Sequence, residues 1–505
     1  MAIDPRTPVI VGVGQSIHRP STPPTLVEPL DLMVDALELA ANDAVTGGRG
    51  TARALLESIE RLTSVVSFTW RTANPSLLVA DRLGLAIDDL ALSATGGAMP
   101  QKLVADAARS IQAGEIEVAA IVGSEAMYSK GLAAKNADLD GSSWTVQGDD
   151  APKARRFGAD FMPLTELEMA RGVLQPVSIY PLFENALRAK EGRSPAPHLQ
   201  RVGDLWASFS EVAASNPMAW ITEPASAETI ITPSPANRMI AEPYTKLMVA
   251  NLPVDQGAAI IVTSFEAALA AGVSRDQMVF PWSHAQGDDP HFISDRPDLG
   301  RSPAIERCGE AALRLASTSI DEVAHVDLYS CFPVAVELGA AALGLPLDDD
   351  RRPLSVTGGL TFGGGPGNNY VSHAIATMTQ RLRAHPGDRG LITGLSYFAT
   401  CHAVALYSTE PPSSPFEAVD LQSELDQLPI QPVDAQMEGQ VVVETFTITH
   451  DRHQGPSTVI AAVRNSSGAR SWGTITDPAI AAQLSGHDLC GWSATLDPEG
   501  VLHLD

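Results

Sequence analysis

Few side chains in this sequence are placed to act as nucleophiles or acid–base groups, and the clearest candidates lie in its second half. Tyr329, Ser330 and Cys331 are consecutive in the segment L-Y-S-C-F, and Cys401 directly precedes His402. A cysteine with a histidine suggests thiolate chemistry. Neighbours on a strand point to opposite faces, however, so Cys401 and His402 are not expected to form a catalytic pair.

A glycine-rich stretch, V-T-G-G-L-T-F-G-G-G-P-G-N-N-Y, lies between these two groups at residues 356–370. Glycines let the backbone approach a ligand closely, and the helix expected over residues 371–385 would direct free N–H groups at it. A long surface loop that needs positive φ angles is the alternative. The stretch is not a Walker loop, since no Gly-Lys-Ser/Thr follows, and its spacing is not that of a dinucleotide site.

Composition narrows the class of protein. A chain of 505 residues suggests two to four domains. The net charge of −26 argues against nucleic acid or an anionic membrane as a partner. No apolar run is long enough to span a bilayer, and the N-terminus does not look like a signal peptide. The scattered cysteines, without C-x-x-C, predict neither disulfides nor a metal site. We therefore expect a soluble, cytoplasmic protein.

Short apolar runs alternate with amphipathic segments, which is typical of an α/β layered fold. Residues 8–15, 62–68 and 117–123 are expected strands, and helices are expected between them. A similar order of elements recurs later, which predicts an internal duplication. The halves would be residues 1–126 plus 239–272, and 273–408, with an inserted loop domain at 127–238.

The C-terminal part has a different pattern. Residues 409–432 contain a Pro-Pro pair, further prolines and scattered acids, and are expected to be a linker. Residues 433–505 contain short β-branched runs separated by turns, such as V-V-V-E-T-F-T-I-T. They predict a small β-barrel domain of the OB type.

Taken together, these segments resemble the thiolase superfamily, in the branch of the sterol-carrier-protein-linked thiolases and their mycobacterial thiolase-like relatives. The resemblance spans roughly residues 6–408 and is carried by P-V-I-V-G-V-G-Q, the segment 111–127, V-D-Q-G-A-A, V-D-L-Y-S-C-F and G-G-L-T-F-G-G-G-P. It implies two β-α-β-α-β-α-β-β halves packed as five layers, with an inserted loop domain. Residues 433–505 also resemble the extra C-terminal domain of the mycobacterial proteins.

A thiolase uses an acyl-accepting cysteine at a helix N-terminus, a histidine that activates it, and a second cysteine that moves the α-proton. In this sequence the resemblance places the nucleophile at Ser93 or Gly96, beside Thr95 and Gly97, and the activating histidine at Gly365, between Gly364 and Pro366. The His-Asp-Cys-Phe segment of the family corresponds to Tyr329, Ser330, Cys331 and Phe332. The position of the second cysteine falls near Gly394, close to His402. Since glycine cannot act as a base, ordinary thiolase activity is expected to be absent.

Three functions remain open on these grounds. The first is binding of CoA or an acyl-CoA thioester, without thiolysis and without a required cofactor, by a protein homologous to acetyl-CoA acetyltransferases. The second is retro-aldol cleavage of a β-hydroxyacyl-CoA, with Tyr329 as the reactive side chain. The third is a non-catalytic partner subunit. A monomer and a homodimer both stay open.

Overall fold

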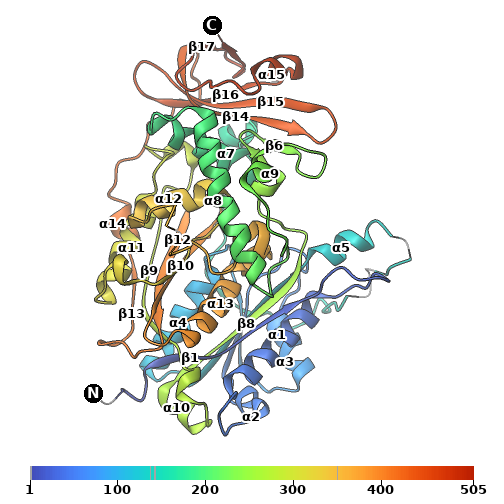
Figure 1. Cartoon of the computed structure of the whole chain (residues 1–505), viewed down its shortest axis with the longest axis vertical. Helices are drawn as coiled ribbons and strands as arrows, with labels where there is room; N and C mark the ends of the chain where they lie inside the picture. The colour runs from blue at the N-terminus through green and yellow to red at the C-terminus, as the bar shows by residue number, and fades with distance from the viewer. Residues whose placement is uncertain (1–2, 137, 141–143, 350, 505) are drawn as a thin grey trace.

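The computed structural model describes residues 3–136, 138–140, 144–349 and 351–504. Two sheets lie in the body of the molecule, and a third sheet forms the end that carries the C-terminus (Figure 1). The first sheet has the order β1-β8-β4-β2-β3-β5. Its strands are β1 (Pro8–Ile17), β2 (Arg61–Ser64), β3 (Asp89–Ser93), β4 (Val118–Ala126), β5 (Arg155–Phe157) and β8 (Asp255–Ser264).

The second sheet repeats the plan of the first. Its order is β10-β11-β12-β9-β13, with β9 (Phe280–Asp288), β10 (His325–Asp327), β11 (Arg389–Ser396), β12 (Cys401–Ser408) and β13 (Glu417–Asp420). The series β9-β12-β11-β10 has the same sequence of antiparallel, antiparallel and parallel pairings as β1-β8-β4-β2. The predicted duplication of α/β halves is confirmed.

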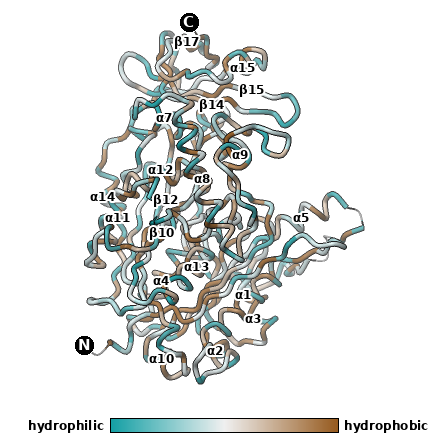
Figure 2. The backbone as a smooth tube through the Cα atoms, in the orientation of Figure 1, coloured by the Kyte–Doolittle hydropathy of each residue, from teal (hydrophilic) through white to brown (hydrophobic). Residues whose placement is uncertain are grey.

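Helices separate and cover these two sheets. Helices α4 (Met99–Ala113) and α13 (Tyr370–Ala384) contact strands of both sheets and form the layer between them. Strands β1, β4, β8, β11 and β12 are buried on both faces along most of their length, whereas the edge strands β5 and β13 are not. Figure 2 shows hydrophobic stretches along the central backbone. Helices α1 (Pro29–Ala44), α3 (Pro75–Leu83) and α10 (Phe265–Ala270) pack against the first sheet, and α2 (Ala52–Glu57) packs against α1. Helix α11 (Pro303–Leu315) packs against the second sheet, and α12 (Pro333–Leu343) packs against α11.

The inserted segment, predicted as a loop domain, contains several helices, two of which are long. Its helices are α5 (Met127–Ala133), α6 (Glu166–Ala170), α7 (Pro176–Lys190), α8 (Pro195–Ser215) and α9 (Ala227–Ile231). Both α7 and α8 begin with a proline, which fits the first helical position because its missing N–H has no partner there. In the described part of the chain, none of the helices has the length and apolar character required to cross a membrane.

The segment predicted as a linker, residues 409–432, instead contains regular structure. Strand β13 pairs in parallel with β9, and the short helix α14 (Gln422–Leu425) follows it. An uncovered edge strand exposes unpaired N–H and C=O groups, and β13 satisfies those of β9. Four residues of mixed polarity are too few to give a strand pattern in the sequence.

The C-terminal sheet has the order β16-β15-β14-β17-β18, and its edges meet at a bridge between Thr474 and Val501. Its elements are β14 (Gly439–Asp451), β15 (Gly455–Arg464), β16 (Arg470–Ile475), α15 (Pro478–Leu484), β17 (Ser493–Leu496) and β18 (Leu502–Leu504). Strands β6 (Met239–Ala241) and β7 (Tyr244–Thr245), from the part assigned to the first half, extend this sheet through β14. The assignment of the domain to the OB type stays a prediction.

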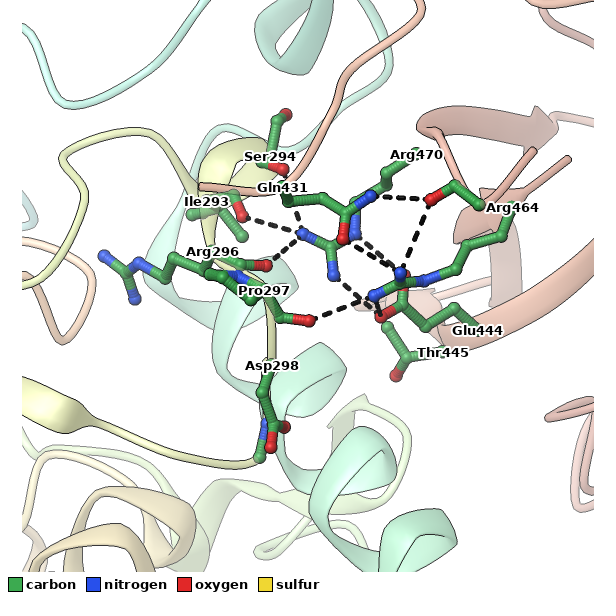
Figure 3. Close-up of polar contacts among 12 residues, drawn as sticks. Ile293, Ser294, Arg296, Pro297, Asp298, Gln431, Glu444, Thr445, Arg464 and Arg470 are labelled. Atoms are coloured by element: carbon green, nitrogen blue, oxygen red, sulfur yellow. Dashed lines mark hydrogen bonds and ion pairs between the residues drawn. The ribbon is translucent and has the colours of Figure 1, made fainter. Parts of the chain in front are cut away.

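The buried side chain of Arg470 fastens this domain to the body of the molecule (Figure 3). Its guanidinium donates to the backbone oxygens of Ser294 and Arg296, at 2.9 and 2.5 Å, and to both carboxylate oxygens of Glu444. Helix α7 packs on the same sheet, where Thr445 donates to the Leu182 carbonyl oxygen. The domain is therefore joined to the body by buried polar contacts.

Candidate functional site

A cavity of about 440 Å³ lies where the two halves and the inserted segment meet. Its walls come from the start of α4, the start of α7, the chain after β10 and the glycine-rich loop. Most lining side chains are apolar or aromatic, including Phe68, Tyr180, Leu252, Phe332, Leu360 and Phe398. Such a concave apolar site with a few polar groups is the usual form of a small-molecule pocket.

The residues at the start of α4 line one end of this cavity. Thr95, Gly96 and Gly97 face it, and Gly96 has a φ of +145° that disfavours other residues. A Cβ atom on Gly96 would lie 2.3 Å from the Ser396 hydroxyl oxygen, and one on Gly97 would lie 2.3 Å from that of Tyr329. Two hydroxyls from the second half therefore occupy the space that a side chain at either position would need.

Ser93 lies inside the protein rather than in the cavity. Its hydroxyl donates to the Ala94 carbonyl oxygen at 2.8 Å and accepts from the Val66 N–H at 3.1 Å. The side chain is fully buried, and no histidine among the described residues forms a hydrogen bond with it. This hydroxyl holds the end of β3 in place.

Tyr329 and Cys331 both line the cavity, whereas Ser330 points to the glycine-rich loop. Burial, and then the neighbouring Cys331, raise the pKa of Tyr329 well above its ordinary value. Burial raises the pKa of the Cys331 thiol to about 12, so it is protonated at neutral pH and is a poor nucleophile. The Ser330 hydroxyl accepts from the Leu360 N–H at 3.3 Å.

The glycine-rich stretch folds into a π-helical turn, Gly359–Gly363, and a 3₁₀ turn, Gly367–Asn369. The buried Asp327 carboxylate anchors its start by accepting from the Val356 N–H and the Tyr370 hydroxyl. Burial raises the pKa of Asp327 to about 6. Of the loop residues, Leu360, Gly367 and Asn368 line the cavity.

Gly364, Gly365 and Pro366 are buried behind this wall. The Gly365 N–H donates to the Asn251 carbonyl oxygen at 3.0 Å, and a Cβ atom on Gly364 would lie 2.2 Å from Gln256 Oε1. These three residues support the loop, and none of them lines the cavity in the described part of the chain.

The last group of predicted residues lies on β11 and β12. Gly394 packs on α4, where a Cβ atom would lie 2.9 Å from the Cα atom of Ala98. His402 borders a small void behind Tyr329, whereas Cys401 lines a second cavity of about 430 Å³ on the other side. The two neighbours face different spaces, as the alternation of strand side chains predicts. They do not form a catalytic pair.

Asn368 and Ser396 are site residues that the sequence reasoning missed. Asn368 accepts from the Gly96 N–H at 2.8 Å and donates to the Val66 carbonyl oxygen at 2.9 Å. The Ser396 hydroxyl accepts from the Ala98 N–H at 3.0 Å. Both therefore hold the start of α4 against the second half. Asn368 directly follows the glycine run, so its position in the sequence could have marked it as a site residue. Nothing in the sequence around Ser396 marks it in this way.

Two duplicated halves in five layers, with an apolar cavity at the start of the central helix, define a thiolase-like protein. Known structures agree. An acetyl-CoA acetyltransferase from Syntrophomonas wolfei matches at 14% identity and a TM-score of 0.55, over 81% of this chain and 100% of its own. The Ltp2–ChsH2(DUF35) aldolase matches at 18% identity and a TM-score of 0.59, over 80% of this chain and 99% of its own. These two likenesses show the thiolase fold.

A third structure gives the family. A monomeric SCP2-thiolase-like protein type 1 from Mycobacterium smegmatis is 30% identical, with a TM-score of 0.82 over 100% of both chains. The chain belongs to the SCP2-thiolase-like protein type 1 family. Residues 420–500 match the family described as the thiolase-like protein type 1 additional C-terminal domain. Comparison with curated proteins gives no match.

Proposed function

We propose that this protein binds the acyl group of a CoA thioester in the cavity at the start of α4, and that it does not carry out ordinary thiolysis. The observation that carries the proposal is the cavity of about 440 Å³, whose wall is largely apolar and to which the described residues contribute no histidine. Burial of a hydrocarbon chain there gives about 0.8 kcal/mol per CH₂ group. No bound cofactor is needed for this role.

The chemistry of the wall supports binding without thiolysis. Gly96 and Gly97 stand at the start of the helix, where they offer no thiol. The cavity-lining thiol is that of Cys331, which burial keeps protonated. Loss of a general base alone typically lowers a rate by about 10²–10⁴-fold. Loss of both the thiolate and its base leaves the pocket as a binding site.

Calorimetry with CoA, acetyl-CoA, butyryl-CoA and octanoyl-CoA tests this function. Affinity is expected to rise with chain length, by about tenfold for each two CH₂ groups, because each group buries more apolar area. Val177→Trp is expected to weaken octanoyl-CoA binding about tenfold or more, since Val177 lines the cavity and the larger ring fills it. Leu174→Trp, on an exposed residue outside the cavity, is the matched control. No binding by any thioester would overturn the proposal.

The Tyr329 hydroxyl favours a second candidate, retro-aldol cleavage of a β-hydroxyacyl-CoA. It lies against Gly97 at the start of α4, in the cavity wall, and no hydrogen-bond partner for it is found among the described residues. In such a cleavage the β-hydroxyl loses its proton to a base, the Cα–Cβ bond breaks, and its electrons form a thioester enolate that takes up a proton. A tyrosine whose pKa is raised stays protonated and can donate a hydrogen bond to the enolate oxygen.

Tyr329→Phe separates the two candidates. If the chain is a lyase, this variant is expected to lose about 10²–10⁴-fold in the rate of aldehyde or ketone release while it binds octanoyl-CoA as the wild type does. Release of the carbonyl product is followed by mass spectrometry. Unchanged cleavage by the variant counts against Tyr329 as the hydrogen-bond donor to the enolate oxygen. If the wild type cleaves no substrate, the binding function is the one that stands.

A monomer is the more strongly supported of the two expected assembly states. The M. smegmatis protein is described as monomeric. In this chain β5 pairs along the outer edge of β3, so that edge is already occupied by the chain itself. We expect the protein to act in the cytoplasm, with a CoA thioester rather than nucleic acid or membrane as its partner.

A further inference from the structure

Three buried ionisable side chains from separate helices meet behind the wall of the cavity. They are Glu184 on α7, His198 on α8 and Glu337 on α12, with 1%, 2% and 3% of their surfaces exposed. One ligand atom from each residue lies within 4.8 Å of the others. Two of the helices belong to the inserted segment and the third to the second half of the core.

The two oxygens of Glu184 have different roles. The Tyr244 hydroxyl donates to Oε2 and itself lies 3.4 Å from the Val334 N–H, which fixes the orientation of the carboxylate. The other oxygen, Oε1, lies 2.5 Å from His198 Nε2. One carboxylate oxygen and one imidazole nitrogen are therefore directed at the same point.

Glu337 completes the group. With its carboxyl group ionised, neither of its oxygens has a hydrogen-bond donor among the described residues, and His198 Nδ1 has no partner either. A hydrogen bond between Glu337 and the neighbouring Glu184 requires a proton on one of the two carboxyl groups. Among the described residues, Glu337 forms an ion pair with Arg201, whose Nη1 lies 3.5 Å from Oε1 and is shared with Glu191 at 3.6 Å. This long, shared contact does not offset the cost of burying two carboxyl groups together, so the site needs either a shared proton or a cation.

We propose that Glu184, His198 and Glu337 bind one divalent transition-metal ion of the zinc type. Two carboxylates balance its charge, and the imidazole distinguishes the site from the all-oxygen sites that Ca²⁺ and Mg²⁺ prefer. Ligand atoms at roughly 2.0–2.2 Å from zinc lie about 3.3 Å apart in tetrahedral geometry, so the ion would open the Glu184–His198 contact slightly. Tyr244 orients Glu184 in the manner of an outer-shell partner.

The position of the site indicates a structural role beside the cavity. Tyr180 lies one helical turn before Glu184 on α7, and Phe332 directly precedes α12. Their rings stack at 4.4 Å, and both line the cavity. An ion at the site would fasten α7 and α8 to α12 and so hold this aromatic wall in place. The inference does not depend on which thioester, if any, occupies the cavity.

Metal binding to the full-length protein, first treated with a chelator and then dialysed, tests the site. Titration with Co²⁺ is expected to give visible d–d absorption that saturates at one equivalent and is displaced by Zn²⁺. Saturating Zn²⁺ is expected to raise the unfolding temperature, since a ligand that binds the folded state stabilises it. Absence of a stoichiometric Co²⁺ spectrum would overturn the proposal.

Variants show whether these residues are the ligands. Glu337→Gln and His198→Gln are each expected to abolish the one-equivalent Co²⁺ spectrum, while far-UV circular dichroism shows that the chain is folded. Glu191→Gln changes a more exposed carboxylate that contacts the same Arg201, and it is expected to keep the spectrum. If both ligand variants bind Co²⁺ as the wild type does, the proposal that these residues are the metal ligands is wrong. If the wild type binds none and Glu337→Gln raises the unfolding temperature, the carboxyls share a proton instead.

Discussion

Replacing Arg470 by methionine is expected to lower the free energy of unfolding by about 3–5 kcal/mol, because it removes one partner of a buried ion pair. The Arg470 side chain is fully buried and bonds Glu444 at 2.7 Å with both Nε and Nη2 (Figure 3). Burial alone would raise the pKa of Glu444, but the hydrogen bonds from Arg470 and Arg464 hold it below its ordinary value. The substitution also leaves the backbone oxygens of Ser294 and Arg296 without this donor.

Arg464→Met is the matched control for this prediction. Arg464 bonds the same Glu444 and the Pro297 carbonyl oxygen, but about a third of its side chain is exposed, at 32%. Its loss is expected to cost about 1 kcal/mol or less, since exposed ion pairs contribute little. Guanidinium chloride unfolding, followed by tryptophan fluorescence and circular dichroism, measures both variants. Equal losses in the two would contradict the larger contribution expected from the fully buried Arg470.

Much of the fold is visible in the sequence because buried strands leave long apolar runs. Strands β1, β4 and β8 are such runs, and the recurrence of their pattern after residue 272 predicts the second half. The pairing of β13 with β9, in contrast, could not be predicted from the sequence. A strand of four residues with an acid at each end has no distinctive period, and its position depends on an edge built by a distant segment.

The site was only partly predictable for a related reason. Tyr329, Cys331 and the glycines at the start of α4 belong to motifs, and the structure brings them to one cavity. Gly365 belongs to a motif as well, yet it lies behind the wall, because the loop turns at Gly363 and Gly364 before it reaches the cavity again at Gly367. The metal-ligand candidates at positions 184, 198 and 337 have no local spacing at all. Only the packing of three helices brings them together.

Gly358→Ala is the second substitution with a large expected effect. Gly358 has φ +90° and ψ +10°, a left-handed conformation that disfavours residues with a Cβ atom. A Cβ atom there would lie 2.6 Å from the Cα atom of Ala213 and 2.7 Å from its backbone nitrogen. The neighbour is the backbone of α8, so it cannot rotate away. Backbone strain and overpacking together are expected to lower the free energy of unfolding by about 2–6 kcal/mol.

Gly387→Ala separates these two costs. Gly387 has a similar φ of +94°, but no atom of the described residues would lie within 4 Å of a Cβ atom there. This variant is expected to lose only the conformational part, about 1–3 kcal/mol. The difference between the two losses, measured by chemical unfolding, reports how closely α8 packs on the glycine-rich loop. Gly358→Ala is also expected to weaken octanoyl-CoA binding, because Leu360 lies two residues further along the same loop and lines the cavity. Equal losses in stability would mean that the loop is free to move away from α8, and that the cavity wall it forms is not fixed by this contact.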